Sequence, residues 1–144
     1  MSTNSSIAIQ LKDGTVKSVY CHWDGYLQYN GAILQESYNS YDQALELIEM
    51  GAISVLTPSF GTKHNFNELY DHLEVKDRPC TFYHRDRGDK WEQATATDLT
   101  TWYDCNQQEY NYLFKDDQWF LVTKLTYTLL LTPLTVLLTQ PTLL

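Results

Sequence analysis

Cysteine is scarce in this 144-residue sequence, and the three cysteines are far apart. Cys21, Cys80 and Cys105 are too few and too scattered for a disulfide framework or for a metal site made of paired cysteines. We therefore expect reduced thiols, no bound metal and no other cofactor.

Lysine and arginine are absent from two long stretches, residues 18–62 and 91–114. Both stretches carry acidic residues, and 18 acidic against 10 basic residues give the chain a formal charge of −8. Such surfaces repel phosphate backbones, so direct nucleic-acid binding is disfavoured and a protein partner with a basic surface is favoured. Solubility is the simpler explanation of the same charge.

A secretory signal is also lacking at the start of the sequence. Met1–Ser6 are polar and have neither the basic start nor the apolar stretch of such a signal, so we expect a cytoplasmic protein. The composition is that of a folded protein, with 43% hydrophobic and 19% charged residues, 11 tyrosines and four tryptophans. The length suits one domain.

Two β-hairpins are predicted from alternating apolar residues. In the first, the alternation covers residues 7–11, Asp13-Gly14 supplies a turn, and a β-rich run resumes at residues 16–23. In the second, the alternation covers residues 110–114, and a turn leads into a return strand at 119–124. Such alternation predicts strands with one covered face.

Helices are predicted at residues 32–38 and directly after Ser40. Ser40 and Gln43 form a capping-box pattern, and Gly51 stops the second helix. Its expected buried face recurs at the i, i+3, i+4, i+7 spacing and consists of Tyr41, Ala44, Leu45 and Ile48.

The middle of the chain is less regular. We expect a strand at residues 53–56, a helix at 65–73, and a strand at 81–84 that runs into a charged turn at 85–90, whereas residues 97–105 fit no single type. Together these elements predict an α+β fold, with a mostly antiparallel sheet built from two or more hairpins and with one or two packed helices.

The last twenty residues, 125–144, carry no charge and are rich in Leu and Thr. Six threonines and two prolines make them a poor membrane helix, so we expect no membrane association. We predict one α+β domain over residues 1–124 and an arm or tail at 125–144. An arm would pack on the body or on a partner, with a homo-oligomer as one outcome; a disordered tail and a tail anchor are the alternatives.

The run from Tyr20 to Tyr26, which reads YCHWDGY, combines aromatic residues, a Cys-His pair and a glycine. Together with Tyr29-Asn30-Gly31 and with later blocks at residues 51–54, 84–88, 110–114 and 119–120, it resembles a family of small proteins carried by bacteriophages and prophages. The likeness covers most of residues 6–123 and leaves out the Leu/Thr-rich end. It implies a phage origin and a place of action in the host cytoplasm, and it carries over no catalytic residue.

One group of residue types in this run suits chemistry. Cys21, His22 and Asp24 would suit a metal, but successive strand residues point to opposite faces, which leaves only His22 and Asp24 together. A cysteine nucleophile, Cys21 or Cys80 beside His22 or His84, is permitted by residue type alone. The alternative is a structural role, with Cys21 buried.

Another group lies in the predicted helix at residues 65–73 and just before it. His64, Glu68 and His72 would share one face of that helix, a spacing at which two imidazoles and a carboxylate converge. A solvated helix face is the alternative, and it is the interpretation we favour.

The charged turn at residues 85–90 would suit a phosphate or a carboxylate. The candidate ligand-binding residues are His84, Arg85, Arg87 and Lys90. Pairing of these cations with Asp86 and Asp89 is the structural alternative.

These observations favour a non-enzymatic phage accessory protein that binds and inhibits a host protein, such as a component of a defence system. The acidic stretches suit a basic host surface, and aromatic residues are enriched in binding hot spots. The candidate partner-binding residues are Trp23, Asp24, Tyr26, Glu36, Asp42, Glu46 and Glu49. One alternative is a binder of a nucleotide-derived small molecule, and another is a small hydrolase that uses a metal or a Cys/His pair.

Overall fold

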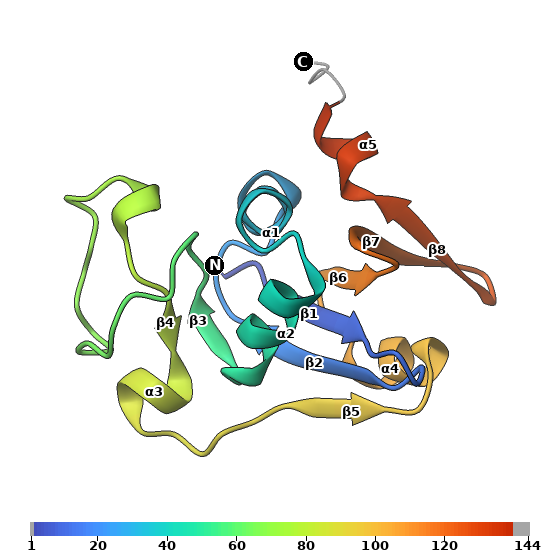
Figure 1. Ribbon diagram of the computed structural model, residues 1–144, viewed down its shortest axis with the longest axis horizontal. Coiled ribbons are helices and arrows are strands. Elements are labelled where there is room, and N and C mark those ends of the chain that lie inside the picture. The colour runs from blue at the N-terminus through green and yellow to red at the C-terminus, as the bar shows by residue number, and fades with distance from the viewer. Residues whose placement is uncertain (1, 140–144) are drawn as a thin grey trace.

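In the computed structural model, which describes residues 2–139, the chain folds around one mixed, mostly antiparallel sheet (Figure 1). The predicted α+β class is thus confirmed. The eight strands of the described residues are β1 (Ser5–Gln10), β2 (Val16–Cys21), β3 (Ile53–Val55), β4 (Thr81–Phe82), β5 (Ala94–Ala96), β6 (Tyr110–Lys115), β7 (Gln118–Leu125) and β8 (Thr128–Pro133). The helices are η1 (Leu27–Gly31), α1 (Ala32–Ser37), α2 (Tyr41–Glu49), η2 (Val75–Asp77), α3 (Tyr83–Arg87), α4 (Leu99–Asn106) and α5 (Leu134–Thr139).

The sheet runs in the order β4-β3-β2-β1-β6-β7-β8, and β5 pairs with β2 on the same edge as β3. Both predicted hairpins are present, as β1–β2 and β6–β7. The two hairpins are joined by parallel pairing of β1 with β6, in which Ile7 lies opposite Tyr112. This pair and the short parallel pair of β2 with β3 make the sheet mixed.

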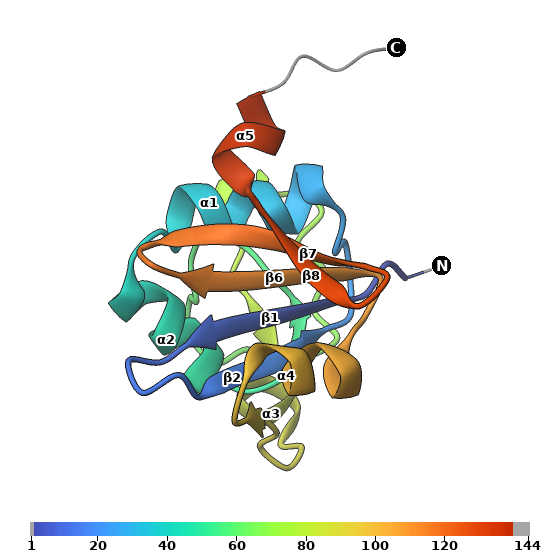
Figure 2. The same cartoon turned by 90° about the vertical axis from the view of Figure 1, so that its right-hand side faces the viewer.

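The centre of the sheet is covered on both faces. Ile7, Ala8 and Ile9 are all fully buried, because Ile7 and Ile9 contact the core under α1 and α2 while Ala8 contacts the core under α4. Figure 2 shows α4 in front of the strands and α1 and α2 behind them. The prediction of one covered face is therefore wrong at the centre of the sheet. Helix α4 places Trp102 on the second face, and this helix comes from the stretch around residues 97–105, which fits no single type in the sequence.

Helix α2 begins and ends as predicted but is rotated from its expected orientation. The Ser40 hydroxyl accepts the N–H of Gln43 at 3.1 Å, and Gly51 has a φ of +84°. The buried residues are Ala44, Leu47 and Ile48, whereas Leu45 is only partly buried. Apolar residues lie at helical spacing on both sides of this face, so the sequence alone allows either side to be buried. Packing against the sheet buries the side with Leu47.

Residues 65–73 are not helical, contrary to the prediction. The segment forms separate turns, in which the N–H of Glu68 bonds to the carbonyl of Asn65 and the Asn65 side chain accepts the N–H of Asn67. Short polar side chains that bond the nearby backbone compete with a helix in this way. His64, Glu68 and His72 therefore share no helix face.

The charged stretch 85–90 is in part a helix, which also corrects the prediction. Helix α3 continues directly from β4 and ends at Gly88, whose φ of +82° is typical of a helix C-terminus. The buried carboxylate of Asp86 accepts the N–H of Phe82, the residue before the helix, at 2.8 Å. That bond stabilises the first turn.

The Leu/Thr-rich segment lies against the body as far as residue 139. Strand β8 pairs with β7 along its length, and Leu134 of α5 is fully buried in the core under α1. Residues 140–144 of the predicted arm or tail lie outside the described residues. Among residues 2–139, none of the helices combines the length and apolar character that a membrane crossing requires.

Candidate functional site

Part of the YCHWDGY run has a structural role. Cys21 is fully buried and accepts a hydrogen bond from the amide of Asn30 at 3.4 Å. Gly25 lies so close to Asn4 that a Cβ on it would come within 2.8 Å of the Asn4 backbone, and its carbonyl accepts the Tyr112 hydroxyl at 2.6 Å. These contacts hold the end of β2 and the residues after it against η1, the segment before β1, and β6.

The buried cysteines are unsuited to nucleophilic attack. Burial raises the pKa of Cys21 to about 12, and it also raises the pKa of Cys80. Both groups are therefore neutral thiols at pH 7, whereas the thiolate is the reactive form.

The other part of the run faces solvent. Trp23 and Tyr26 are 42% and 37% exposed, and the Trp23 ring packs edge-on against His22 at 4.7 Å between centroids. Burial raises the pKa of Tyr20, and its hydroxyl is hydrogen-bonded to Nδ1 of His22 at 2.6 Å. Within residues 2–139, no group of three or more His, Cys, Asp or Glu side chains is placed to hold a metal ion.

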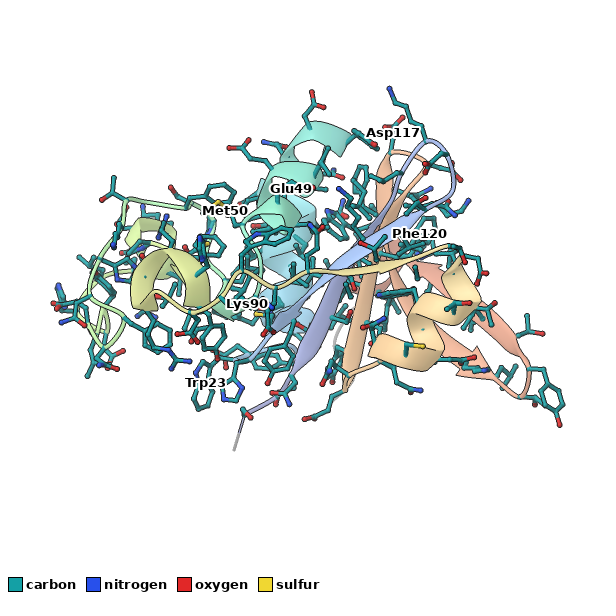
Figure 3. The ribbon with its side chains drawn as sticks, turned by 90° about the horizontal axis from the view of Figure 1, so that it is seen from below. Trp23, Glu49, Met50, Lys90, Asp117 and Phe120 are labelled. Carbon is teal, nitrogen blue, oxygen red and sulfur yellow. The ribbon has the colours of Figure 1, made fainter. Side chains whose placement is uncertain are left out.

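The predicted acidic residues lie on a different surface from Trp23. Glu36 of α1 and the α2 residues Asp42, Glu46 and Glu49 are all exposed, and Glu49 pairs with Lys17 at 3.1 Å. In Figure 3, Trp23 lies below Lys90 and Glu49 lies above it, so the two residues are on different sides of the molecule. The seven candidate partner-binding residues therefore form two surfaces.

A groove of about 510 Å³ runs between α2 and the loop at residues 58–62; we call it the acidic groove. Its walls include the rings of Tyr38 and Phe60, which stack at 6.0 Å between centroids, together with Gln43 and Glu46. None of its lining residues is a lysine or an arginine. The groove thus combines aromatic faces with a carboxylate and has no cation of its own.

The candidate ligand-binding cations around α3 have different surroundings. Arg85 turns inward, where it donates to the Asp86 carboxylate and to the Cys80 carbonyl, both at 2.9 Å. Arg87 donates to the exposed Asp89 carboxylate at 2.6 Å, and the His84 ring bonds to the Asp89 carbonyl. The structure therefore gives Arg85 a structural role and leaves Arg87 at the surface.

A second hollow of about 480 Å³ opens beside Tyr20, between β3 and β5. It continues into a hollow beside α3, because Tyr20, Lys90 and Glu92 line both; we call the two together the β2 cleft. Trp91 and Tyr83 are further wall residues. Of the predicted ligand-binding residues, Arg87 and Lys90 reach this cleft.

Sequence reasoning missed the aromatic residues of both hollows. Tyr38, Phe60, Tyr83 and Trp91 belong to separate segments that the fold brings beside α2 or β2, and no local motif marks them. No protein-family model, curated protein or solved structure matches the chain.

Proposed function

We propose that the protein is a non-enzymatic phage accessory protein that binds a basic segment of a host protein in the acidic groove and inhibits that protein. A component of a host defence system is the target we favour. The proposed place of action is the host cytoplasm. The observation that carries the proposal is the acidic groove itself, which is lined by both Glu46 and Phe60 and by no lysine or arginine.

The groove suits a lysine or arginine side chain. A guanidinium or ammonium group gains from contact with an aromatic face, and a hydrogen bond between charged groups is stronger than a neutral one. Glu46 and Phe60 offer both features in one hollow. Asp42 and Glu36 are exposed on α2 and α1 and add negative charge on the same side of the sheet.

We expect the Asp42→Asn/Glu46→Gln double variant to bind its partner at least about tenfold more weakly, because the loss of even one charge-assisted hydrogen bond costs about 1.5–3 kcal/mol. The partner is first captured from host lysate by the wild-type protein and then measured in isolation by surface plasmon resonance. The wild-type association rate should also fall as salt rises, since screening weakens electrostatic steering.

The matched control is Glu68→Gln/Asp71→Asn, which removes the same two charges from the exposed turns of residues 65–73. It should bind like the wild type. Equal loss in both double variants would show that net charge alone matters and would refute the assignment to the acidic groove.

We also propose that copies of the chain associate through β8, the last strand of the sheet. Its hairpin exposes Tyr127 and Leu130, and residues 125–139 carry no charge that would oppose a second copy of this acidic chain. Light scattering after size exclusion should give a dimer that Leu130→Lys converts to a monomer. A monomeric wild-type protein would contradict this proposal.

A further inference from the structure

The outer edge of β2 is interrupted at the β2 cleft. Strand β5 pairs with β2 at residues 16–18, and β3 pairs with it only at Cys21. Among the described residues, no strand lies beside Val19 and Tyr20 on that edge, and the β2 cleft opens at this gap. Strand β3 is parallel to β2 and β5 is antiparallel to it, so the two do not form one continuous strand along this edge. The hollow lies between them.

The aromatic walls of the cleft are held in place by the fold. The Trp91 indole N–H donates to the Glu49 carbonyl at 3.0 Å, and the ring lies so close to Gly51 that a Cβ there would be 2.9 Å from it. Tyr20 is fixed by its bond to His22, and the Arg87 guanidinium lies over one face of the Tyr83 ring, 4.9 Å from its centroid. Such preformed aromatic walls suit a flat ring, since stacking then costs little ordering.

The polar groups of the cleft are of two kinds. Lys90 is exposed, forms no ion pair among residues 2–139, and lies in Figure 3 between Trp23 and Met50. Glu92 lines the same walls and is an acceptor for N–H groups. Of the other charges here, Arg87 and Asp89 neutralise each other. The cleft thus offers a ligand one cation, Lys90, and one carboxylate, Glu92, beside aromatic rings.

We propose that the β2 cleft binds a mononucleotide whose base carries an exocyclic amino group. The base stacks on the tyrosine walls, Glu92 accepts from the amino edge, and Lys90 binds the phosphate. A volume of about 480 Å³ lies within the range of small-molecule sites. This inference does not depend on the acidic groove, which lies on the far side of α2 and shares no residue with the cleft.

Isothermal titration calorimetry of the full chain with AMP, GMP, CMP and UMP, and with the matching nucleosides, tests the proposal. At least one amino-bearing nucleotide should bind with 1:1 stoichiometry, more tightly than UMP and than its own nucleoside. Lys90→Gln should weaken that binding at least about tenfold, because a charge-assisted contact is lost. Tyr83→Leu, which keeps apolar volume but removes the ring, should weaken it as well.

Lys76→Gln is the control, since Lys76 is exposed and lies outside the cleft. It should leave nucleotide affinity unchanged, as should Asp42→Asn/Glu46→Gln. The proposal is overturned if none of the four nucleotides gives a binding isotherm, if nucleosides bind as tightly as nucleotides, or if Lys90→Gln behaves like Lys76→Gln. Because the acidic-groove variants are assayed in parallel, failure of one proposal is distinguishable from failure of the other.

Discussion

Asp86→Asn is expected to lower the free energy of unfolding by about 3–5 kcal/mol, the usual cost of removing one partner of a buried ion pair. The Asp86 carboxylate is fully buried and accepts the N–H groups of Phe82 and His64 as well as the Arg85 guanidinium. The amide would keep the volume but leave Arg85 without its counter-charge. Urea unfolding at pH 7 followed by tryptophan fluorescence measures the difference.

The loss should depend on pH in a definite direction. Burial pushes the pKa of Asp86 up, but the bonds from Arg85, Phe82 and His64 outweigh it and hold the pKa below its ordinary value of 3.8. A carboxyl whose pKa is lower in the folded state stabilises the protein above the unfolded pKa, and this contribution is lost as pH falls through the folded pKa. The wild type and Asp86→Asn should therefore differ most well above pH 3.8 and converge as pH falls through the lowered pKa of Asp86.

Asp89→Asn is the matched control on the same helix end, because Asp89 forms an exposed ion pair with Arg87. We expect only a small change in stability from it at any pH, because an exposed ion pair contributes little. Equal losses in the two variants would mean that Asp86 is no more than a surface partner of Arg85.

The elements that could be predicted from the sequence are those whose signal lies within a few residues. The Asp13-Gly14 turn sets the first hairpin, and Ser40 and Gly51 mark the two ends of α2 by chemistry that needs no distant partner. Helix α4 had such a signal too, because Asp98 caps it by accepting the N–H of Thr101 at 2.8 Å. Asp98 therefore marks the start of α4 by a local signal, although the pattern of the residues after it fits no single type.

What could not be predicted depends on contacts between distant segments. Nothing near Ile7 shows that it will lie beside Tyr112 in a parallel pair, and this pair decides which strands form the centre of the sheet. The β2 cleft exists only because β3 and β5 share one edge of β2. Tyr20 and Tyr83 are brought together by that arrangement and by no motif.

Charge in a sequence likewise does not show burial. Arg85 and Arg87 look equivalent in the sequence, yet Arg85 is held by a buried carboxylate while Arg87 faces solvent. The acidic stretch that contains Glu46 can be read from the sequence. The aromatic wall of the same groove cannot, because Phe60 comes from the loop after β3. The charge pattern therefore predicts an acidic surface but does not predict the groove in that surface.

The rotated face of α2 leads to the second large effect: Leu47→Ala should cost about 2–5 kcal/mol of unfolding free energy, the range for emptying a buried leucine site. Leu47 is fully buried in the core under α2, whereas Leu45 is only partly buried.

Leu45→Ala is the control, because both substitutions place the same helix-favouring residue in the same helix and differ only in the face they change. It should cost less than half as much, since a partly exposed site loses less buried area and leaves no closed cavity. Thermal and urea unfolding of the two variants give the comparison. Losses of equal size, or a larger loss at Leu45, would show that α2 instead buries the face on which Tyr41, Ala44, Leu45 and Ile48 lie.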